Sequence, residues 1–217
     1  MRSAIKADEA AQLIPDGASI MIGGFLAVGT PDRLVDALVA RRARGLTVIA
    51  NDTARPGIGI GKLIDGGCVA RVVVSHIGTN PVTQRLMLDQ ELQVELVPQG
   101  TLAERIRAGG AGLGGVLTPT GIGTAAAEGK RVIEADGREY LLELPLRAGF
   151  ALIHAHEADH YFNLTYRLTA TNFNPVMAMA ADCVIAEAEE VVPVGVIPPD
   201  QVRTSGVLVD YLVQRRL

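Results

Sequence analysis

The stretch that decides the fold is residues 16–31, which read DGASIMIGGFLAVGTP. Its apolar run at 18–22 follows a Pro-Asp-Gly turn and stops at two glycines, which is typical of a buried strand entering a tight turn. Thr30, Pro31 and Asp32 then supply a cap, a first helical residue and an early acid for a helix. The stretch therefore predicts one strand–turn–helix unit.

The same unit repeats three more times, up to residue 107. The predicted strands lie at 46–50, 72–74 and 94–97. A short predicted helix comes after the glycine-rich segment 56–61, a second helix covers 82 to about 89, and a third covers 102–107 with Thr101 as its cap. Strands that alternate with helices in this way form a parallel sheet, and ligands bind beyond the carboxyl ends of such strands. We therefore expect the four polar turns to gather at one edge of the sheet.

The pattern changes after residue 107. The glycine-rich segment 109–123 is predicted to be an ordered loop, and 132–134 with 139–142 flank an Asp-Gly turn and predict a β-hairpin. Later strands are predicted at 150–154, 183–186 and 208–209, and a small-residue helix at 175–181. The predicted fold class is α/β, with an open, mainly parallel sheet flanked by helices in Rossmann-like layers and a small antiparallel β appendage. We expect a single domain over 1–217, with the hairpin in an insertion at about 109–148.

The composition of the chain argues against nucleic-acid binding, secretion and membrane insertion. The chain has 217 residues, 20 basic against 24 acidic, a net charge of −4 and no basic block, so nucleic acid is not an expected partner. Two distant cysteines, Cys68 and Cys183, fit a reducing compartment and are expected to be small buried side chains. Residues 1–12 are polar and helix-prone rather than a signal peptide, and no apolar run is long enough to cross a membrane. We expect a cytoplasmic protein.

The glycine turn after the first predicted strand favours anion binding. Gly23, Gly24 and Gly29 are expected to leave backbone N–H groups bare near a helix N-terminus, where oxyanions bind well. The spacing differs from the dinucleotide pattern G-x-G-x-x-G, and the chain has no G-x-x-x-x-G-K-[ST] loop. A tight strand–helix turn without a ligand is the alternative interpretation.

Residues 16–31 match, position by position, the signature of family I coenzyme A transferases. The resemblance extends over nearly the whole chain, through 50–54, 75–81, 97–101, 109–112, 118–121 and 170–175. The chain is most similar to α subunits of the acetate/acetoacetate, short-chain fatty acid type, and it resembles the N-terminal half of succinyl-CoA:3-oxoacid CoA transferase. The resemblance implies that coenzyme A binds at the following residues: Gly23, Gly24, Phe25, Leu26, Ala27, Val28 and Gly29.

The resemblance also implies a partner and a mechanism. Family members pair with a homologous β subunit, commonly as an α2β2 heterotetramer, and exchange coenzyme A by a ping-pong reaction through a β-subunit glutamate. The candidate acids here, at 127–129 and 186–190, do not match the motif around that glutamate, and the second run reads more simply as a solvated face. We therefore expect this chain to lack the nucleophile. Gln99 occupies the position of a family glutamine that faces the reacting carboxylates, so it is expected to be an orienting donor.

No cofactor or metal is expected, because the coenzyme A thioester is itself a substrate. His154, His156 and His160 invite a metal interpretation, with the first two on one face of a strand, but no further ligand lies in register. His76 follows a buried strand and is expected to be a polar loop residue near the cleft.

Several functions remain compatible with the sequence. The main hypothesis is an enzyme subunit that moves coenzyme A between acetoacetyl-CoA or acetyl-CoA and a free carboxylate such as acetate or a short fatty acid. A 3-oxoadipate coenzyme A transferase subunit is the alternative enzyme, and a non-catalytic coenzyme A-binding module is the alternative from another class. A sugar-phosphate isomerase of related fold is weaker, because fold does not fix function and that chemistry needs a base within the chain.

Overall fold

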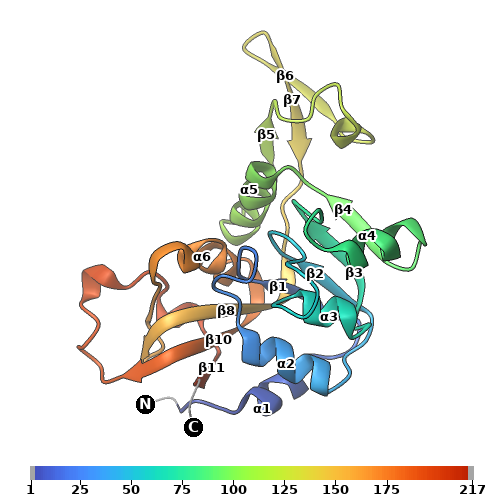
Figure 1. The fold of residues 1–217 in the computed structure, drawn as a ribbon. Coiled ribbons are helices and arrows are strands. Elements are labelled where there is room, and N and C mark those ends of the chain that lie inside the picture. Colours follow the sequence, from blue (N-terminus) through green and yellow to red (C-terminus); the bar gives the residue numbers. More distant parts are fainter. Residues whose placement is uncertain (1–2, 215–217) are drawn as a thin grey trace.

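The computed structural model describes residues 3–214, which form a large sheet and a small one (Figure 1). The large sheet contains the strands β1 (Ser19–Ile22), β2 (Leu46–Ile49), β3 (Val69–Val74), β4 (Gln93–Leu96), β8 (Ala148–Asp159), β9 (Leu164–Thr165), β10 (Ala181–Val192) and β11 (Tyr211–Gln214). The helices are α1 (Ala7–Gln12), α2 (Asp32–Ala40), α3 (Gly61–Asp65), α4 (Pro81–Leu88), α5 (Gln99–Gly110) and α6 (Asn174–Ala178). None of the helices in this described part is long and apolar enough to cross a membrane.

The large sheet is parallel along its main path. Its strand order is β11-β10-β8-β1-β2-β3-β4, and only β9, which pairs with β8, runs antiparallel. The chain moves outward from β1 to β4 on one side and then returns as β8 on the other side of β1. This reversal makes the carboxyl end of β1 the topological switch point, where parallel sheets form their ligand crevice.

Helices cover both faces of the sheet. Along β1, Ile20 and Ile22 point into the core beneath α1, α2 and α3, whereas Met21 points into the core beneath α5 and α6. Strands β2, β3 and β8 divide their side chains between the two cores in the same way. Because successive strand residues face opposite sides, short uninterrupted apolar strands are what a sheet covered on both faces requires. The predicted α/β fold class is confirmed.

Most predicted elements are present, with three corrections. The strand predicted at 208–209 is wrong, since a 3-10 turn occupies Gly206–Leu208 and β11 begins at Tyr211. The Thr101 cap is also wrong, because α5 already begins at Gln99 after Pro98. Segment 109–123 is not all loop: its first two residues end α5, and β5 (Val116–Thr118) follows.

The glycines that end α5 explain why that stretch looked like a loop. A Cβ atom on Gly109 would collide with the Leu146 carbonyl, and one on Gly110 would lie 2.6 Å from Cβ of Met179. Helix α5 can therefore pack closely on its neighbours only with glycine at these two positions, although glycine lowers helix propensity.

The N-terminal helix and the two cysteines can also be compared with the sequence prediction. Helix α1 covers the second half of the helix-prone segment 1–12, whose first two residues lie outside the described part. Cys68 is buried, as expected, whereas Cys183 is half-buried, and both are free thiols.

The small sheet consists of β5, β6 (Val132–Ala135) and β7 (Arg138–Glu143), in the order β5-β7-β6 with antiparallel pairing. The predicted hairpin is its β6–β7 part, and β5 adds a third strand. Figure 1 shows this sheet projecting beyond α5, away from α1 and α2. Its three strands fall within 109–148, and the assignment of the whole chain to one domain stays a prediction.

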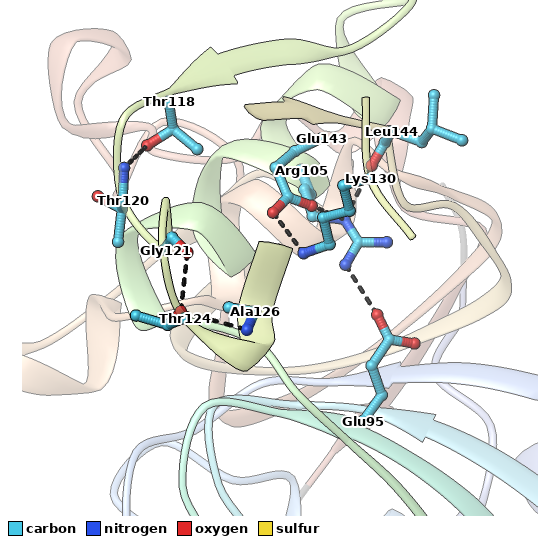
Figure 2. A network of polar contacts seen from close by, with 10 residues as sticks. All are labelled: Glu95, Arg105, Thr118, Thr120, Gly121, Thr124, Ala126, Lys130, Glu143 and Leu144. Carbon is cyan, nitrogen blue, oxygen red and sulfur yellow. Dashed lines mark hydrogen bonds and ion pairs between the residues drawn. The ribbon is translucent and has the colours of Figure 1, made fainter. Parts of the chain in front are cut away.

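A chain of charges ties the small sheet to the large one (Figure 2). Arg105 of α5 donates to Glu95 of β4 at 2.9 Å and to the Leu144 carbonyl at 2.8 Å, and its Nε lies 3.8 Å from buried Glu143 of β7. Lys130 also pairs with Glu143, at 2.6 Å. Burial alone would raise the pKa of Glu95, but hydrogen bonds and charges from Arg105 and Arg71 hold it below its ordinary value. Arg105 therefore joins three elements through one guanidinium.

Arg105→Met should lower the free energy of unfolding by about 2 kcal/mol, because it removes the charged hydrogen bonds to Glu95 and to the Leu144 carbonyl. Urea denaturation monitored by circular dichroism measures the loss. Arg107→Met is the matched control, since Arg107 sits on the same helix in an exposed pair with Glu104 that contributes less than about 1 kcal/mol. Equal losses in the two variants would contradict the role given to Arg105.

Candidate functional site

The four turns predicted to converge do so. The loops after β1, β2 and β3 and the start of α5 enclose a cavity of about 350 Å³ at the carboxyl edge of the sheet. The residues that line it are Phe25, Leu26, Asn51, Asp52, Ser75, His76 and Gln99. The cavity lies beside the switch point, where the parallel topology places a ligand crevice.

Asp52 connects the turn after β1 to the end of β2. Its Oδ2 accepts hydrogen bonds from Leu26 N at 2.9 Å and from Asn51 Nδ2 at 2.6 Å, while Oδ1 accepts from Ala54 N at 2.7 Å. The side chain is buried, so each of these bonds is exchanged for one that water would have made. Breaking the set would leave a charged group unsatisfied, which makes Asp52 the polar anchor of the cavity floor.

Gln99 and Ser75 extend this network. Gln99 Nε2 donates to Asn51 Oδ1 at 2.6 Å, and Ser75 Oγ donates to the Asn51 carbonyl at 2.7 Å. Gln99 is exposed and lines the cavity, and its role as an orienting donor stays a prediction. His76 is an exposed loop residue that lines the same cavity, as expected, and a Cβ on Gly78 would lie 2.7 Å from its ring.

The turn over residues 23–29 is a short, exposed finger. Phe25 and Val28 exchange two backbone hydrogen bonds of 3.0 and 2.9 Å around Leu26 and Ala27, which have φ values of 46° and 73°. Two successive positive φ values are the geometry of a type I′ hairpin turn, which bulky residues adopt at a cost. Phe25, Leu26 and Val28 remain 40–49% exposed at its tip.

The expectation of bare backbone donors at the glycines of this turn is wrong for Gly23 and Gly24. The N–H groups of Gly23, Gly24, Phe25, Leu26 and Val28 donate to acceptors within the chain. The part these residues play in coenzyme A binding stays a prediction, and it must use mainly the exposed side chains and carbonyls of the finger.

Two asparagines, one just before α6 and one at its first residue, hold the glycines in place. Asn172 Oδ1 accepts from Gly24 N at 3.1 Å, and its Nδ2 donates to the Val28 carbonyl at 2.9 Å. Asn174, fully buried, donates to the Gly29 carbonyl at 2.9 Å, and a Cβ on Gly23 would collide with its side chain. The glycines are therefore required for close approach of these amides, a function that the sequence pattern did not reveal.

Helix α2 receives its cap from a distant strand rather than from Thr30. Glu187 Oε2 on β10 accepts from Arg33 N at 2.9 Å and from Leu34 N at 3.1 Å. The side chain is only 3% exposed, so the interpretation of 186–190 as a solvated face is wrong for this residue. Burial raises the pKa of Glu187 to about 7, against the two backbone hydrogen bonds, which lower it. Only the pairing of distant segments brings this acid to the helix N-terminus.

Glu187 should make stability depend on pH between about 5 and 8. Its pKa rises from 4.5 when unfolded to about 7 when folded, so the native state holds the proton more tightly. This stabilisation is complete below pH 4.5 and is lost as pH rises through 7, by roughly 3 kcal/mol in total. The free energy of unfolding, measured by urea titration at several pH values, should fall with pH by this amount relative to Glu187→Gln, which keeps an acceptor but does not titrate.

Glu187→Ala removes the acceptor as well and should cost about 1 kcal/mol more than Glu187→Gln at pH 8. Parallel pH profiles for the wild-type chain and Glu187→Gln would show that the buried carboxyl does not titrate in this range.

His154 and His156 lie on one face of β8, as predicted, and both reach Glu189 of β10. The distances are 3.2 Å from His154 Nε2 to Oε1 and 3.0 Å from His156 Nδ1 to Oε2. Burial alone would raise the pKa of Glu189, but His156 and His154 lower it. Within residues 3–214 no group of three or more His, Cys, Asp or Glu side chains could hold a metal ion.

A family model described as coenzyme A transferase matches residues 4–215. The chain belongs to this family. Relatives more than 50% identical to the chain are named as α subunits of coenzyme A transferases. The prediction that this chain is an α subunit is therefore confirmed.

Two relatives and one structure define the relationship. The chain is 55% identical over 198 residues to the acetate CoA-transferase subunit alpha of Escherichia coli (strain K12), covering 91% of this chain and 90% of that one. It is 53% identical over 199 residues to the acetoacetyl-CoA:acetate/butyrate CoA transferase alpha subunit of Clostridium acetobutylicum, covering 92% and 91%.

The crystal structure of the acyl-CoA transferase YdiF apoenzyme from Escherichia coli O157:H7 superposes with a TM-score of 0.85 at 25% identity. The match covers 97% of this chain but 46% of YdiF, so the present chain spans about half the length of that enzyme. The predicted coenzyme A transferase-like fold is thereby confirmed.

Proposed function

We propose that the chain is the α subunit of a transferase that moves coenzyme A between acetoacetyl-CoA or acetyl-CoA and a free acid such as acetate or a short fatty acid. The names of the two relatives above 50% identity support this substrate class. One alternative is a transferase for 3-oxoadipate, whose second carboxylate would need a positive charge in the pocket. The other alternative is a non-catalytic coenzyme A-binding module.

The observation that carries the proposal is the buried, hydrogen-bonded acid in the cavity. Among the described residues that line it, Asp52 is the one carboxylate, and three hydrogen bonds already engage its oxygens. Covalent acyl transfer needs a carboxylate that can move onto the acyl carbon, and Asp52 could do so only by giving up its hydrogen bonds to Leu26, Asn51 and Ala54. The nucleophile is therefore a glutamate of a homologous β subunit, which forms first an acyl anhydride and then a thioester with coenzyme A.

The residues of this chain bind coenzyme A and orient the reacting carboxyl group. Gln99, held by Asn51, is the orienting donor that faces the reacting carboxyl, and residues 23–29 contact coenzyme A. Coenzyme A is a substrate here, and the reaction uses no cofactor or metal. The assembly is an α2β2 heterotetramer in the cytoplasm.

Coenzyme A exchange from acetoacetyl-CoA to acetate should appear only when this chain is mixed with its β subunit. The assay compares each chain alone with the mixture. Full activity of this chain alone would overturn the assignment of the nucleophile to the partner. An inactive mixture that forms a stable complex would favour the 3-oxoadipate transferase if 3-oxoadipate restores turnover, and the binding module if it does not.

Gln99→Met in the assembled enzyme should lower kcat by about 100-fold, because it removes a donor aimed at developing negative charge while conserving side-chain length. Gln93→Met is the control, since Gln93 is exposed at the opposite end of β4. Steady-state kinetics of both variants check the expectation. A kcat within twofold of the wild type would remove Gln99 from the reaction.

A further inference from the structure

The cavity at the sheet edge holds a histidine that the hydrogen bonds of its floor do not use. Of the described side chains that line it, Asp52 and His76 are the two that can carry a charge, and three hydrogen bonds already engage the Asp52 oxygens. A free acid that enters the cavity is an anion beside this buried carboxylate, so its binding needs a strong or positively charged donor. Among these described residues His76 alone can supply positive charge.

Hydrogen bonds from side chains hold the loop that carries His76. Four side chains of the loop and of α4 make them, each to a backbone carbonyl: Ser75 Oγ to Asn51 at 2.7 Å, Thr79 Oγ1 to Ala54 at 2.8 Å, Asn80 Nδ2 to Thr53 at 2.9 Å, and Gln84 Nε2 to both Ile77 and Gly78 at 3.1 Å. The backbone of His76 also forms a parallel bridge with that of Asp52. The backbone beneath the histidine is therefore fixed before a ligand arrives, which lowers the entropy cost of binding.

The ring of His76 is left free for a ligand. The residue is exposed, and its side chain has no hydrogen bond or ion pair to any of residues 3–214, whereas His154 and His156 both reach Glu189. Gly78 makes room for the ring, because a Cβ there would lie 2.7 Å from Cε1 and 3.0 Å from Nε2. An imidazole donates an N–H in either protonation state, so it can bond a carboxylate oxygen directly. A rigid loop with one unengaged donor is the arrangement that ligand binding requires.

The sheet places His76 beside the other groups of the cavity. Strands β2, β3 and β4 are successive neighbours in the sheet, and Asp52, His76 and Gln99 follow their carboxyl ends in that order. The histidine thus comes from the strand between the one that precedes the buried acid and the one that precedes the amide proposed to orient the reacting carboxyl. Phe25 and Leu26 of the finger supply the apolar part of the same lining.

We propose that His76 binds the carboxylate of the free acid in this cavity, with the short hydrocarbon tail against Phe25 and Leu26. This assignment rests on the proposed transferase function. In the transfer step, one oxygen of the acid forms the C–O bond of the anhydride while the C–S bond of the glutamyl thioester breaks and coenzyme A leaves as its thiolate. The other oxygen accepts the N–H of His76, so no proton changes place.

Butyrate binding can be followed on the full-length chain through the ¹H–¹³C NMR signals of its four imidazole rings. Titration should move the His76 signal, identified by its loss in His76→Gln, in a saturable way and leave those of His154, His156 and His160 in place. Butyramide, which lacks the charge, should bind at least about tenfold more weakly. Equal binding of butyramide, or shifts centred on His154 and His156, would overturn the proposal.

His76→Phe keeps a planar ring over Gly78 and removes both ring nitrogens. It should weaken butyrate binding, followed by backbone amide signals, at least about tenfold, because a hydrogen bond to a charged group is lost. His76→Gln keeps a side-chain donor and should recover most of the affinity. His160→Phe is the matched control, since His160 directly follows β8 and does not line the cavity, and it should leave binding unchanged. Undiminished affinity of His76→Phe, or an equal loss in His76→Gln, would contradict the role given to His76.

In the assembled enzyme, His76→Phe should lower kcat/KM for butyrate at least about tenfold. The inhibition constant of S-butyl-coenzyme A, a thioether without a free carboxylate, should stay within twofold. A loss of both would show a general disturbance of the site and overturn the proposal. An active enzyme in which His76→Phe leaves kcat/KM for butyrate unchanged would refute the acid contact and leave the transferase assignment intact. Butyrate binding at His76 in a chain whose complex never transfers coenzyme A would do the reverse.

Discussion

The hydrogen bonds of the Asp52 carboxylate are the interaction on which the site depends. They join the finger after β1 to the end of β2, and Asn51 passes the connection on to Ser75 and to Gln99. A parallel sheet brings these strand ends together but does not fix the loops that follow them. The buried Asp52 carboxylate does fix them, because a displacement would break its hydrogen bonds and leave a buried charge unsatisfied.

Close packing between backbone and amide side chains sets the shape around this anchor. Asn174 approaches the finger so closely that Gly23 has no room for a Cβ, and Ala170 leaves none at Gly29. Glu187 fixes the start of α2 from the other side of β1. The finger is thus rigid where it meets the sheet and exposed and apolar at its tip, which suits a surface that a ligand or a second subunit completes.

Helix α5 connects the cavity at the sheet edge with the small sheet. Its first residue, Gln99, lines that cavity, and its second turn carries Arg105, which is bonded to β4 and to the chain after β7. The position of Gln99 therefore depends on a charge network in the small sheet as well as on the loops of the large one.

The sequence by itself determined the order of strands and helices, the convergence of the four turns, the hairpin and the family, because apolar runs, glycine turns and local spacing are local properties. It could not determine the start of α5, since Thr101 has the side chain of a cap, nor the strand after Leu208. Only the tertiary structure decided that Glu187 caps α2 and that the glycines accommodate Asn174 and Ala170. Each of these depends on contacts between segments far apart in the chain, and burial and partners in such contacts are set by packing rather than by neighbours in sequence.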